Sequence, residues 1–207
     1  MTSLQIGGLG LNTIDVRAAA PTELARAIDT LVLAFSTDPF TRWVLPDPHD
    51  YLTRFPAILR EFGAGAFENS TAYVTSDFRG ASLWLPPGVH PDEDALGAVC
   101  RGCASGQHLA DFLEVLDQMG RFDPGGPHWY LPMIGVDPTR QNGGLGSALL
   151  RHALARIDQE GALAYLESSN PANISLFERH GFEVIDEIRV GTSPPVSPML
   201  RRPGVSI

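Results

Sequence analysis

The sequence feature that most constrains the fold is the stretch IGVDPTRQNGGLGSALL, residues 134 to 150. An apolar run ends at Pro138, polar residues follow, and Gly143, Gly144 and Gly146 precede a helical pattern. Glycines let the backbone approach a ligand without interference from a Cβ atom. The first N–H groups of a helix have no partner within the helix and lie at the positive end of its dipole. The stretch therefore predicts a strand, a turn and a helix N-terminus that together bind an anion such as a phosphate.

Two common phosphate-binding motifs do not fit this turn. The loop that binds nucleoside triphosphates has a lysine after its glycines, whereas this chain contains no lysine. The dinucleotide fingerprint has a third glycine and follows the first strand of its domain, whereas Gly144-Leu145-Gly146 is followed by SAL, two-thirds of the way along the chain. An NAD-dependent oxidoreductase is therefore disfavoured. A glycine turn that only closes a strand–helix connection stays open on these residues alone.

The remaining secondary structure is predicted from apolar periodicity and from turn residues. The segment 36–50 carries Pro39, Pro46 and Pro48, so we predict a loop there with about one helical turn. The other predicted elements are, in order, a strand in 13–19, a helix from Pro21 to about Phe35, a helix over 50–67, an antiparallel strand pair at 71–77 and 79–88, helices within 91–124, a long strand ending at 136, a helix over 144–160, a strand at 163–169, a helix over 171–180 and a strand at 182–190.

This order places antiparallel strands early and a strand–helix–strand unit at the glycines. It predicts an α/β (α+β) three-layer domain with a mainly antiparallel mixed central sheet and helices on both faces. No segment has the composition of a linker, so we predict a single domain over residues 1–207. An apolar stripe in the second half of 91–124 is predicted to be core rather than a cofactor site. It consists of Leu109, Phe112, Leu113, Leu116 and Met119.

Charge and composition argue against several classes of function. A net charge of −9 argues against a nucleic-acid partner, because binding to phosphate backbones rests on clustered Lys and Arg. The N-terminus lacks a signal-peptide pattern, and no apolar run reaches the ~18 residues of a membrane helix, so we expect a cytoplasmic protein without a membrane partner. Cys100 and Cys103 have no second cysteine pair or flanking histidine, so we predict reduced thiols and no metal site.

Two motifs resemble the GNAT family of N-acetyltransferases. Residues Gln141 to Gly146 match that family's acyl-CoA-binding motif, Gln/Arg-x-x-Gly-x-Gly/Ala, and follow Val136-Asp137-Pro138 in the family's register. The later stretch YLESSNPANISLFERHGFEV resembles the family's next strand, its asparagine-bearing helix and its Gly-Phe turn. The segments LAFSTDPFTRWVLPD, ASLWLPPG and WYLPMIGVDP are more loosely similar to the branch that contains puromycin N-acetyltransferase.

The resemblance implies an acetyl-CoA site in a coenzyme-binding core of about residues 127–190. In this family two strands splay apart, and the free backbone edge pairs with the pantetheine arm like an added strand. Pro132 removes a ladder donor near the expected splay. Backbone groups of Met133, Ile134 and Val136 are expected to contact the pantetheine and the thioester. The pyrophosphate is expected to bind Gln141, Asn142, Gly143, Gly144, Leu145, Gly146 and Ser147.

A side chain of the following helix is also implied in coenzyme binding. Asn173 resembles the residue that hydrogen-bonds the pantetheine, and Asn170 is the alternative. A helix cap is an equally reasonable role for Asn170, because Pro171 suits the first helical position.

The implied reaction is direct attack of a small molecule's primary amine on the acetyl thioester in a ternary complex. It needs a base for the amine proton, stabilisation of the carbonyl oxygen and a route for the departing thiolate. Glu167 is the candidate base, and a surface carboxylate at a strand end is the alternative interpretation. The backbone N–H of Met133 or Ile134 is the candidate donor to the carbonyl oxygen.

One residue departs from the family's pattern. Many members carry a tyrosine that protonates the thiolate, and Phe177 occupies that position here. Tyr130, Ser168 or a water molecule are the candidate replacements, and a non-catalytic acyl-CoA-binding sensor is the alternative function. His180 precedes Gly181 at a helix end, where a capping role is expected.

The acceptor site is expected on the early loop DPFTRWVLPD and the helix after it. Phe40, Trp43 and Trp84 are candidates for its wall, although aromatic residues are equally typical of a core. The sequence identifies neither the amine nor the oligomeric state, for which a homodimer stays open.

Overall fold

The computed structural model describes residues 14–91, 97 and 102–204, and its centre is a seven-stranded sheet in the order β1-β2-β3-β4-β5-β7-β6. Neighbouring strands are antiparallel except β4 and β5, which run parallel. The predicted mainly antiparallel, mixed sheet is therefore confirmed. The strands are β1 (Val16–Ala18), β2 (Ala72–Thr75), β3 (Gly80–Leu85), β4 (His128–Val136), β5 (Leu163–Ser168), β6 (Glu183–Val184) and β7 (Ser197–Arg201).

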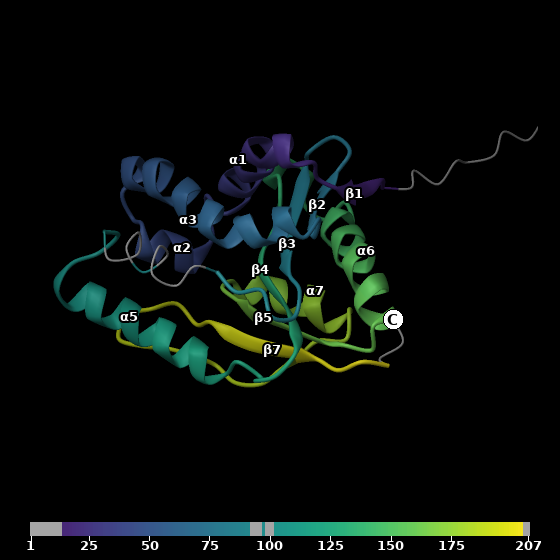
Figure 1. The fold of residues 1–207 in the computed structure, drawn as a ribbon. Helices are drawn as coiled ribbons and strands as arrows, with labels where there is room; N and C mark the ends of the chain where they lie inside the picture. The colour runs from purple at the N-terminus through teal and green to yellow at the C-terminus, as the bar shows by residue number, and fades with distance from the viewer. Residues whose placement is uncertain (1–13, 92–96, 98–101, 205–207) are drawn as a thin grey trace, which may run out of the picture.

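Helices cover both faces of the sheet, as Figure 1 shows, so the predicted three-layer architecture is confirmed. One face carries α1 (Leu24–Ala34), α2 (Pro39–Val44), α3 (Pro48–Glu68) and α5 (Gly106–Arg121), whose apolar side chains share one core. The other face carries α6 (Leu145–Gln159) and α7 (Ile174–Glu178), which form a second core with Trp84 and Trp129. Short 3-10 turns lie at Pro21–Glu23, Pro138–Arg140 and Pro171–Asn173.

The prediction of a loop with about one helical turn over residues 36–50 is only partly correct: α2 is that turn, but α3 already begins within the segment, at Pro48. Pro39 and Pro48 each occupy the first turn of a helix, where the missing N–H costs nothing. The Asp38 side chain accepts a hydrogen bond from the Thr41 N–H at 2.9 Å and thereby caps α2. Asp47 caps α3 in the same way. The early prolines therefore mark helix starts and set the direction of α2 and α3.

The C-terminal part of the sheet also differs from the prediction. The strand predicted at 182–190 is reduced to β6, followed by an isolated bridge between Ile188 and Val196. The strand β7 was not predicted, and it inserts between β5 and β6. Its last residue, Arg201, is fully buried, where it donates to the His180 carbonyl at 2.8 Å and forms an ion pair with Asp158.

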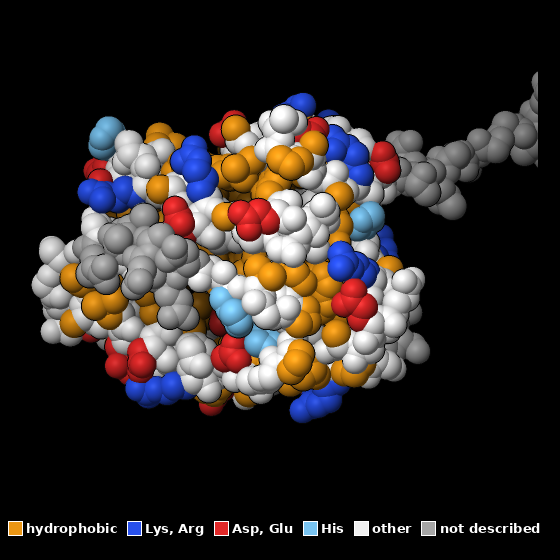
Figure 2. Space-filling model, in the orientation of Figure 1, with side chains coloured by type: hydrophobic (Ala, Val, Ile, Leu, Met, Phe, Trp, Pro, Cys, Tyr) orange, Lys and Arg blue, Asp and Glu red, His pale blue; other side chains and the backbone are white. Residues whose placement is uncertain are grey.

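The structure also bears on the cysteines, on metal-binding clusters, on membrane helices and on the distribution of arginines. Cys100 lies outside the described residues, and Cys103 is partly buried. Within the described ranges, no cluster of three or more His, Cys, Asp and Glu side chains has the geometry to hold a metal ion. No helix in that same part of the chain has the length and apolar character needed to cross a bilayer. On the face drawn in Figure 2, arginine side chains are scattered rather than gathered in one patch.

Candidate active site

Strands β4 and β5 separate part-way along their length. They pair only over the first three residues of β4, His128–Tyr130, whereas β4 continues to Val136 against β3 alone. The pairing of β3 with β4 shifts by one residue at Leu131 and Pro132, which forms a β-bulge. Pro132 suits this position because proline has no N–H to give to a ladder. Beyond the bulge, one backbone edge of β4 therefore faces a gap in the sheet rather than another strand.

An outer cleft of about 480 Å³ lies in this gap, between the end of β4, the glycine turn, the start of α6 and the side of α7. Two arginines, Arg140 and Arg179, also line it. Met133 lines a different cavity, and Gly143 is not among the lining residues of either space. The residues of the predicted coenzyme site that do line the outer cleft are Ile134, Val136, Gln141, Asn142, Gly144, Leu145, Gly146, Ser147 and Asn173.

The glycine turn has the backbone geometry of an anion site. Asn142 and Gly144 adopt left-handed conformations, with φ of 61° and 84°, and such alternation turns successive N–H groups toward one point. Gly144 is the N-cap of α6, and the Ala148 N–H donates to its carbonyl at 2.9 Å. The N–H groups between these two residues precede the first intrahelical bond and lie at the positive end of the helix. The turn thus offers several backbone donors to a negatively charged group in the cleft.

Glycines are also required where α1 packs on β4 and where α7 packs on the start of α6. A Cβ atom on Gly135 would lie 2.5 Å from the Ala34 side chain of α1, and one on Gly146 would lie 3.3 Å from Leu176. Glycine at these positions allows α1 and α7 to close the sides of the cleft.

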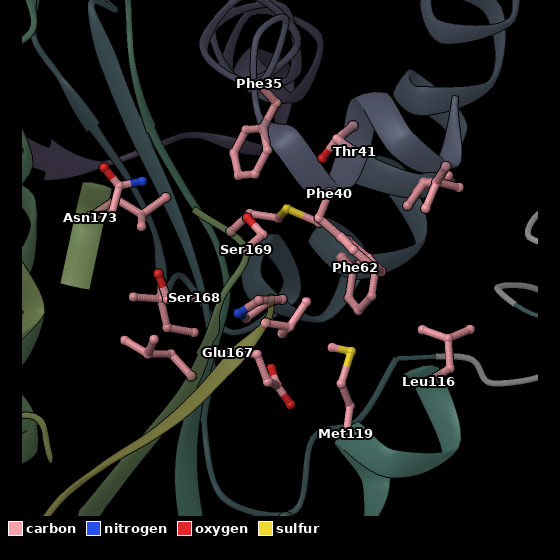
Figure 3. A pocket seen from close by; sticks show the side chains of 18 of the residues that line it. Phe35, Phe40, Thr41, Phe62, Leu116, Met119, Glu167, Ser168, Ser169 and Asn173 are labelled. Atoms are coloured by element: carbon pink, nitrogen blue, oxygen red, sulfur yellow. The ribbon is translucent and has the colours of Figure 1, made fainter. Parts of the chain in front are cut away.

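An inner cavity adjoins the outer cleft, and Phe35, Ile134, Asn173 and Phe177 line both spaces. The inner cavity lies among α2, α3, α5 and the diverging ends of β4 and β5, and its walls are mainly aromatic and aliphatic. Figure 3 shows Ser168 and Asn173 on one side of it and the α5 side chains on the other, with Glu167 between them. The splay therefore connects a backbone anion site to an apolar cavity that contains one carboxylate.

Glu167 is partly buried where the inner cavity meets a side cavity that is also lined by Asp123 and His128. Burial raises the pKa of Glu167 to about 7, and the charge of Asp123 adds to the rise. Hydroxyl groups of Tyr130 and Tyr165 stabilise the carboxylate and oppose the rise. Near neutral pH such a carboxylate exists in both protonation states, which suits a group that accepts a proton.

The two candidate proton donors, Tyr130 and Ser168, line the inner cavity together with Glu167. Tyr130 stacks on Tyr165 with ring centroids 6.0 Å apart, and burial raises its pKa well above the ordinary value, so its hydroxyl keeps its proton. The Ser168 hydroxyl is buried and donates to the Asn170 carbonyl at 3.1 Å. The structure thus brings Glu167, Tyr130 and Ser168 to the wall of one cavity.

Three residues around α7, namely Asn170, His180 and Phe177, have structural roles. Asn170 caps the turn before α7, since its side chain accepts from the Ala172 N–H at 3.0 Å. His180 is buried with Nδ1 2.8 Å from the Leu176 carbonyl oxygen, and burial lowers its pKa, which fits the expected cap. Phe177 is only 4% exposed and packs on Phe182, yet its ring borders both the cleft and the inner cavity.

The sequence did not single out Asp38 as part of this region. Asp38 lines the outer cleft and accepts a hydrogen bond from the Ser169 hydroxyl at 2.8 Å, which joins the start of α2 to the end of β5. Burial raises the pKa of Asp38, although bonds from Thr41 and Ser169 oppose the shift. An aspartate directly before a proline is a signal for a helix start, and it could have revealed this residue's position.

The expected aromatic wall is only partly correct. Phe40 lines the inner cavity, whereas Trp43 stacks on Phe40 from outside, with ring centroids 5.7 Å apart. Trp84 is fully buried in the core on the other face of the sheet, so its assignment to the wall is wrong.

The predicted apolar stripe on α5 is also only partly correct. Phe112, Leu116 and Met119 line the inner cavity, and Leu109 packs against the first core. Leu113 is 43% exposed, so its assignment to the stripe is wrong.

Comparisons with known proteins agree with this geometry. The model of the Acetyltransferase (GNAT) family matches residues 66–182. An uncharacterised N-acetyltransferase of Schizosaccharomyces pombe is 30% identical over 144 residues, 61% of this chain and 58% of that protein. A mycothiol acetyltransferase of Salinispora tropica is 46% identical over 54 residues, which are 24% of this chain and 18% of that protein. Both matches span less than two thirds of these relatives' own lengths.

A solved structure is similar over nearly the whole chain. The Corynebacterium glutamicum protein described as histone acetyltransferase HPA2 and related acetyltransferase is 26% identical, with a TM-score of 0.66, and the match covers 93% of this chain and 98% of that one. The finer resemblance to the puromycin branch stays a prediction. Because the family match covers more than half of the chain, and the splayed sheet and the glycine turn lie within that fold, this chain belongs to the GNAT acetyltransferase family.

Proposed function

We propose that this chain is an acetyl-CoA-dependent N-acetyltransferase that acts on the primary amine of a small molecule in a ternary complex. The observation that carries the proposal is the splay between β4 and β5, which joins the anion site of the outer cleft to the carboxylate of the inner cavity. A coenzyme in the cleft and an amine in the cavity would meet at this opening.

The residues present fit the coenzyme. The backbone donors at Gly144, Leu145, Gly146 and Ser147 line the cleft and would bind a pyrophosphate. A hydrogen bond to a charged group contributes about 1.5–3 kcal/mol, so a few such donors suffice without a lysine. The edge of β4 at Met133, Ile134 and Val136 would pair with the pantetheine arm, and the Asn173 side chain lies where the cleft and the inner cavity meet.

Acetyl-CoA would supply the acetyl group: the amine nitrogen bonds to the carbonyl carbon, the C–S bond breaks, and its electron pair leaves with the sulfur. In this proposal Glu167 accepts the amine proton, because its pKa of about 7 leaves much of it ionised near neutral pH. The backbone N–H of Met133 or Ile134 would stabilise the negative charge that develops on the carbonyl oxygen.

Protonation of the sulfur is assigned to Tyr130 or Ser168. Tyr130 holds its proton at neutral pH, and it lines the inner cavity together with Glu167. Ser168 also lines the inner cavity, but its hydroxyl already donates to the Asn170 carbonyl. Phe177 has no proton to give at the junction of the two spaces, and this observation favours the second candidate function, an acyl-CoA-binding sensor without turnover.

A thiol-release assay separates these functions. The protein is mixed with acetyl-CoA and a panel of primary amines, free thiol is measured over time, and the acetylated amine is identified by mass spectrometry. The proposal predicts thiol and acetylamide in equal amounts, and only when an amine is present. Binding of acetyl-CoA without thiol release from any amine would support the sensor, and failure to bind acetyl-CoA would contradict both functions.

A further inference from the structure

The walls of the inner cavity limit the acceptors that can enter it. Five phenylalanines line it from α2, α3, α5 and the end of α1, and they are Phe35, Phe40, Phe55, Phe62 and Phe112. They support one another, since the rings of Phe40 and Phe112 lie 6.2 Å apart and those of Phe35 and Phe55 lie 5.6 Å apart. Trp43 stacks on the outside of Phe40, and its indole N–H donates to the Thr192 hydroxyl at 3.2 Å, which fixes α2 in place.

Charge within the inner cavity is confined to a single side chain. Among the described residues that line it, Glu167 is the only one with a carboxyl group, and none is an arginine or a histidine. The part of the wall formed by Phe35, Phe40 and Phe112 borders no part of the side cavity and is entirely apolar. A cationic group placed against that wall would lose its hydration and gain no partner, which is strongly unfavourable.

The size of the inner cavity matches a single ring. Its volume is about 150 Å³, and an engineered apolar cavity of roughly that volume holds benzene. From the wall, the charge and the size together, we propose that the acceptor is a monocationic amine with one aromatic or similarly bulky apolar group. The apolar group packs between α2, α3 and α5, and the nitrogen lies at Glu167. This inference rests on the proposed function and narrows it to a substrate class.

A competing route leads through the side cavity, which contains Asp123. This side cavity shares five lining residues with the inner cavity: Phe62, Leu116, Met119, Tyr130 and Glu167. A polyamine could lie there with a second ammonium group near Asp123. His128 already occupies part of that carboxylate's surroundings, with Nε2 3.5 Å from it. The side cavity is therefore a poorer site for a second ammonium group than the inner cavity is for an aromatic ring. Acetylation of a polyamine is the alternative outcome that the test must distinguish.

The test compares kcat/KM for phenethylamine, agmatine and spermidine in the thiol-release assay. The proposal predicts that phenethylamine exceeds both polycations by at least about 100-fold. Equal or higher kcat/KM for agmatine or spermidine would overturn the proposed substrate class while leaving the N-acetyltransferase function intact. Thiol release with none of the three, and with no other amine, would instead contradict the proposed function.

A pair of variants on α5 locates the specificity. Phe112→Glu adds a carboxylate to the apolar wall and is predicted to raise the ratio of agmatine to phenethylamine kcat/KM at least tenfold. Leu113→Glu places the same charge on the exposed side of α5 and should leave that ratio unchanged. An unchanged ratio in a folded Phe112→Glu protein would overturn the assignment of this wall.

A second variant keeps the proposal falsifiable if Phe112→Glu does not fold. Met119→Ala enlarges the inner cavity without adding charge. It is predicted to raise kcat/KM for a two-ring naphthylalkylamine relative to phenethylamine at least tenfold. The same relative preference in wild type and Met119→Ala would overturn the proposal.

Discussion

Replacing Glu167 by Gln tests the proposed base through two independent readouts. In the wild type, a pKa of about 7 means that about a tenth of Glu167 is ionised at pH 6 and about nine-tenths at pH 8. We therefore expect kcat at saturating amine to rise roughly tenfold between these pH values, with an inflection near 7. Glu167→Gln should lower kcat by about 10²–10⁴-fold and remove that inflection, because general base catalysis is typically of this size.

The same substitution has a predictable effect on stability. The pKa of Glu167 is raised from 4.5 to about 7 in the folded protein, so its contribution to stability is present below pH 4.5 and is lost as the pH rises through 7. Over the interval from pH 5 to pH 8 the wild type should lose about 2–3 kcal/mol at this site. Glutamine does not titrate, so the stability of Glu167→Gln relative to wild type should increase by that amount.

Urea unfolding of both proteins at pH 5 and pH 8 measures this difference directly. A constant difference in unfolding free energy at the two pH values would show that the pKa of Glu167 is not raised by burial. Unchanged kcat in a folded Glu167→Gln protein across pH 6 to 9 would remove Glu167 from the mechanism.

Three further predictions concern the glycine turn, the missing acid and the buried ion pair. Gly144→Val should weaken acetyl-CoA binding, measured by calorimetry, at least 100-fold. Gly161 has a similar positive φ at the far end of α6, so Gly161→Val should cost a similar ~1–2 kcal/mol of stability but keep full affinity for acetyl-CoA. Equal affinity in the two variants would refute the placement of the pyrophosphate. Phe177→Tyr places a hydroxyl between the cleft and the inner cavity and should raise kcat about tenfold, and an unchanged kcat would show that sulfur leaves without an acid from this position. Asp158→Asn removes the carboxylate that faces the fully buried Arg201 and should destabilise the fold by about 3 kcal/mol in urea unfolding, whereas a loss below 1 kcal/mol would mean that the ion pair is not needed.

The local signals around the glycine turn were sufficient to predict this part of the fold. Gly144 and the apolar periodicity after it locate the start of α6 correctly, since both depend on backbone conformation within a few residues. Pro132 likewise indicated where the ladder between strands would be interrupted. These predictions succeeded because each rests on a local rule that tertiary packing did not override.

Other features depend on contacts between distant segments and could not be predicted. The strand β7 contains Pro198 and ends in Arg201, residues that are untypical of a central strand, and it forms because β5 and β6 both pair with it. Trp84 is buried on the face of the sheet that α6 and α7 cover. The face depends on the register of β3 with its neighbours, which the sequence of one strand does not specify. The inner cavity is lined by residues of α2, α3 and α5, and apolar periodicity cannot distinguish such a lining from ordinary core packing.

The most direct test of the central claim is a thermal-shift titration with acetyl-CoA, coenzyme A and NAD. Ligand that binds only the native state at 100 times its Kd adds about 2.7 kcal/mol of stability, which corresponds to a rise in Tm of roughly 5–10 °C for a chain of this length. We predict such a rise with acetyl-CoA and coenzyme A and none with NAD. No rise with either coenzyme A species, or an equal rise with NAD, would contradict the assignment of the outer cleft.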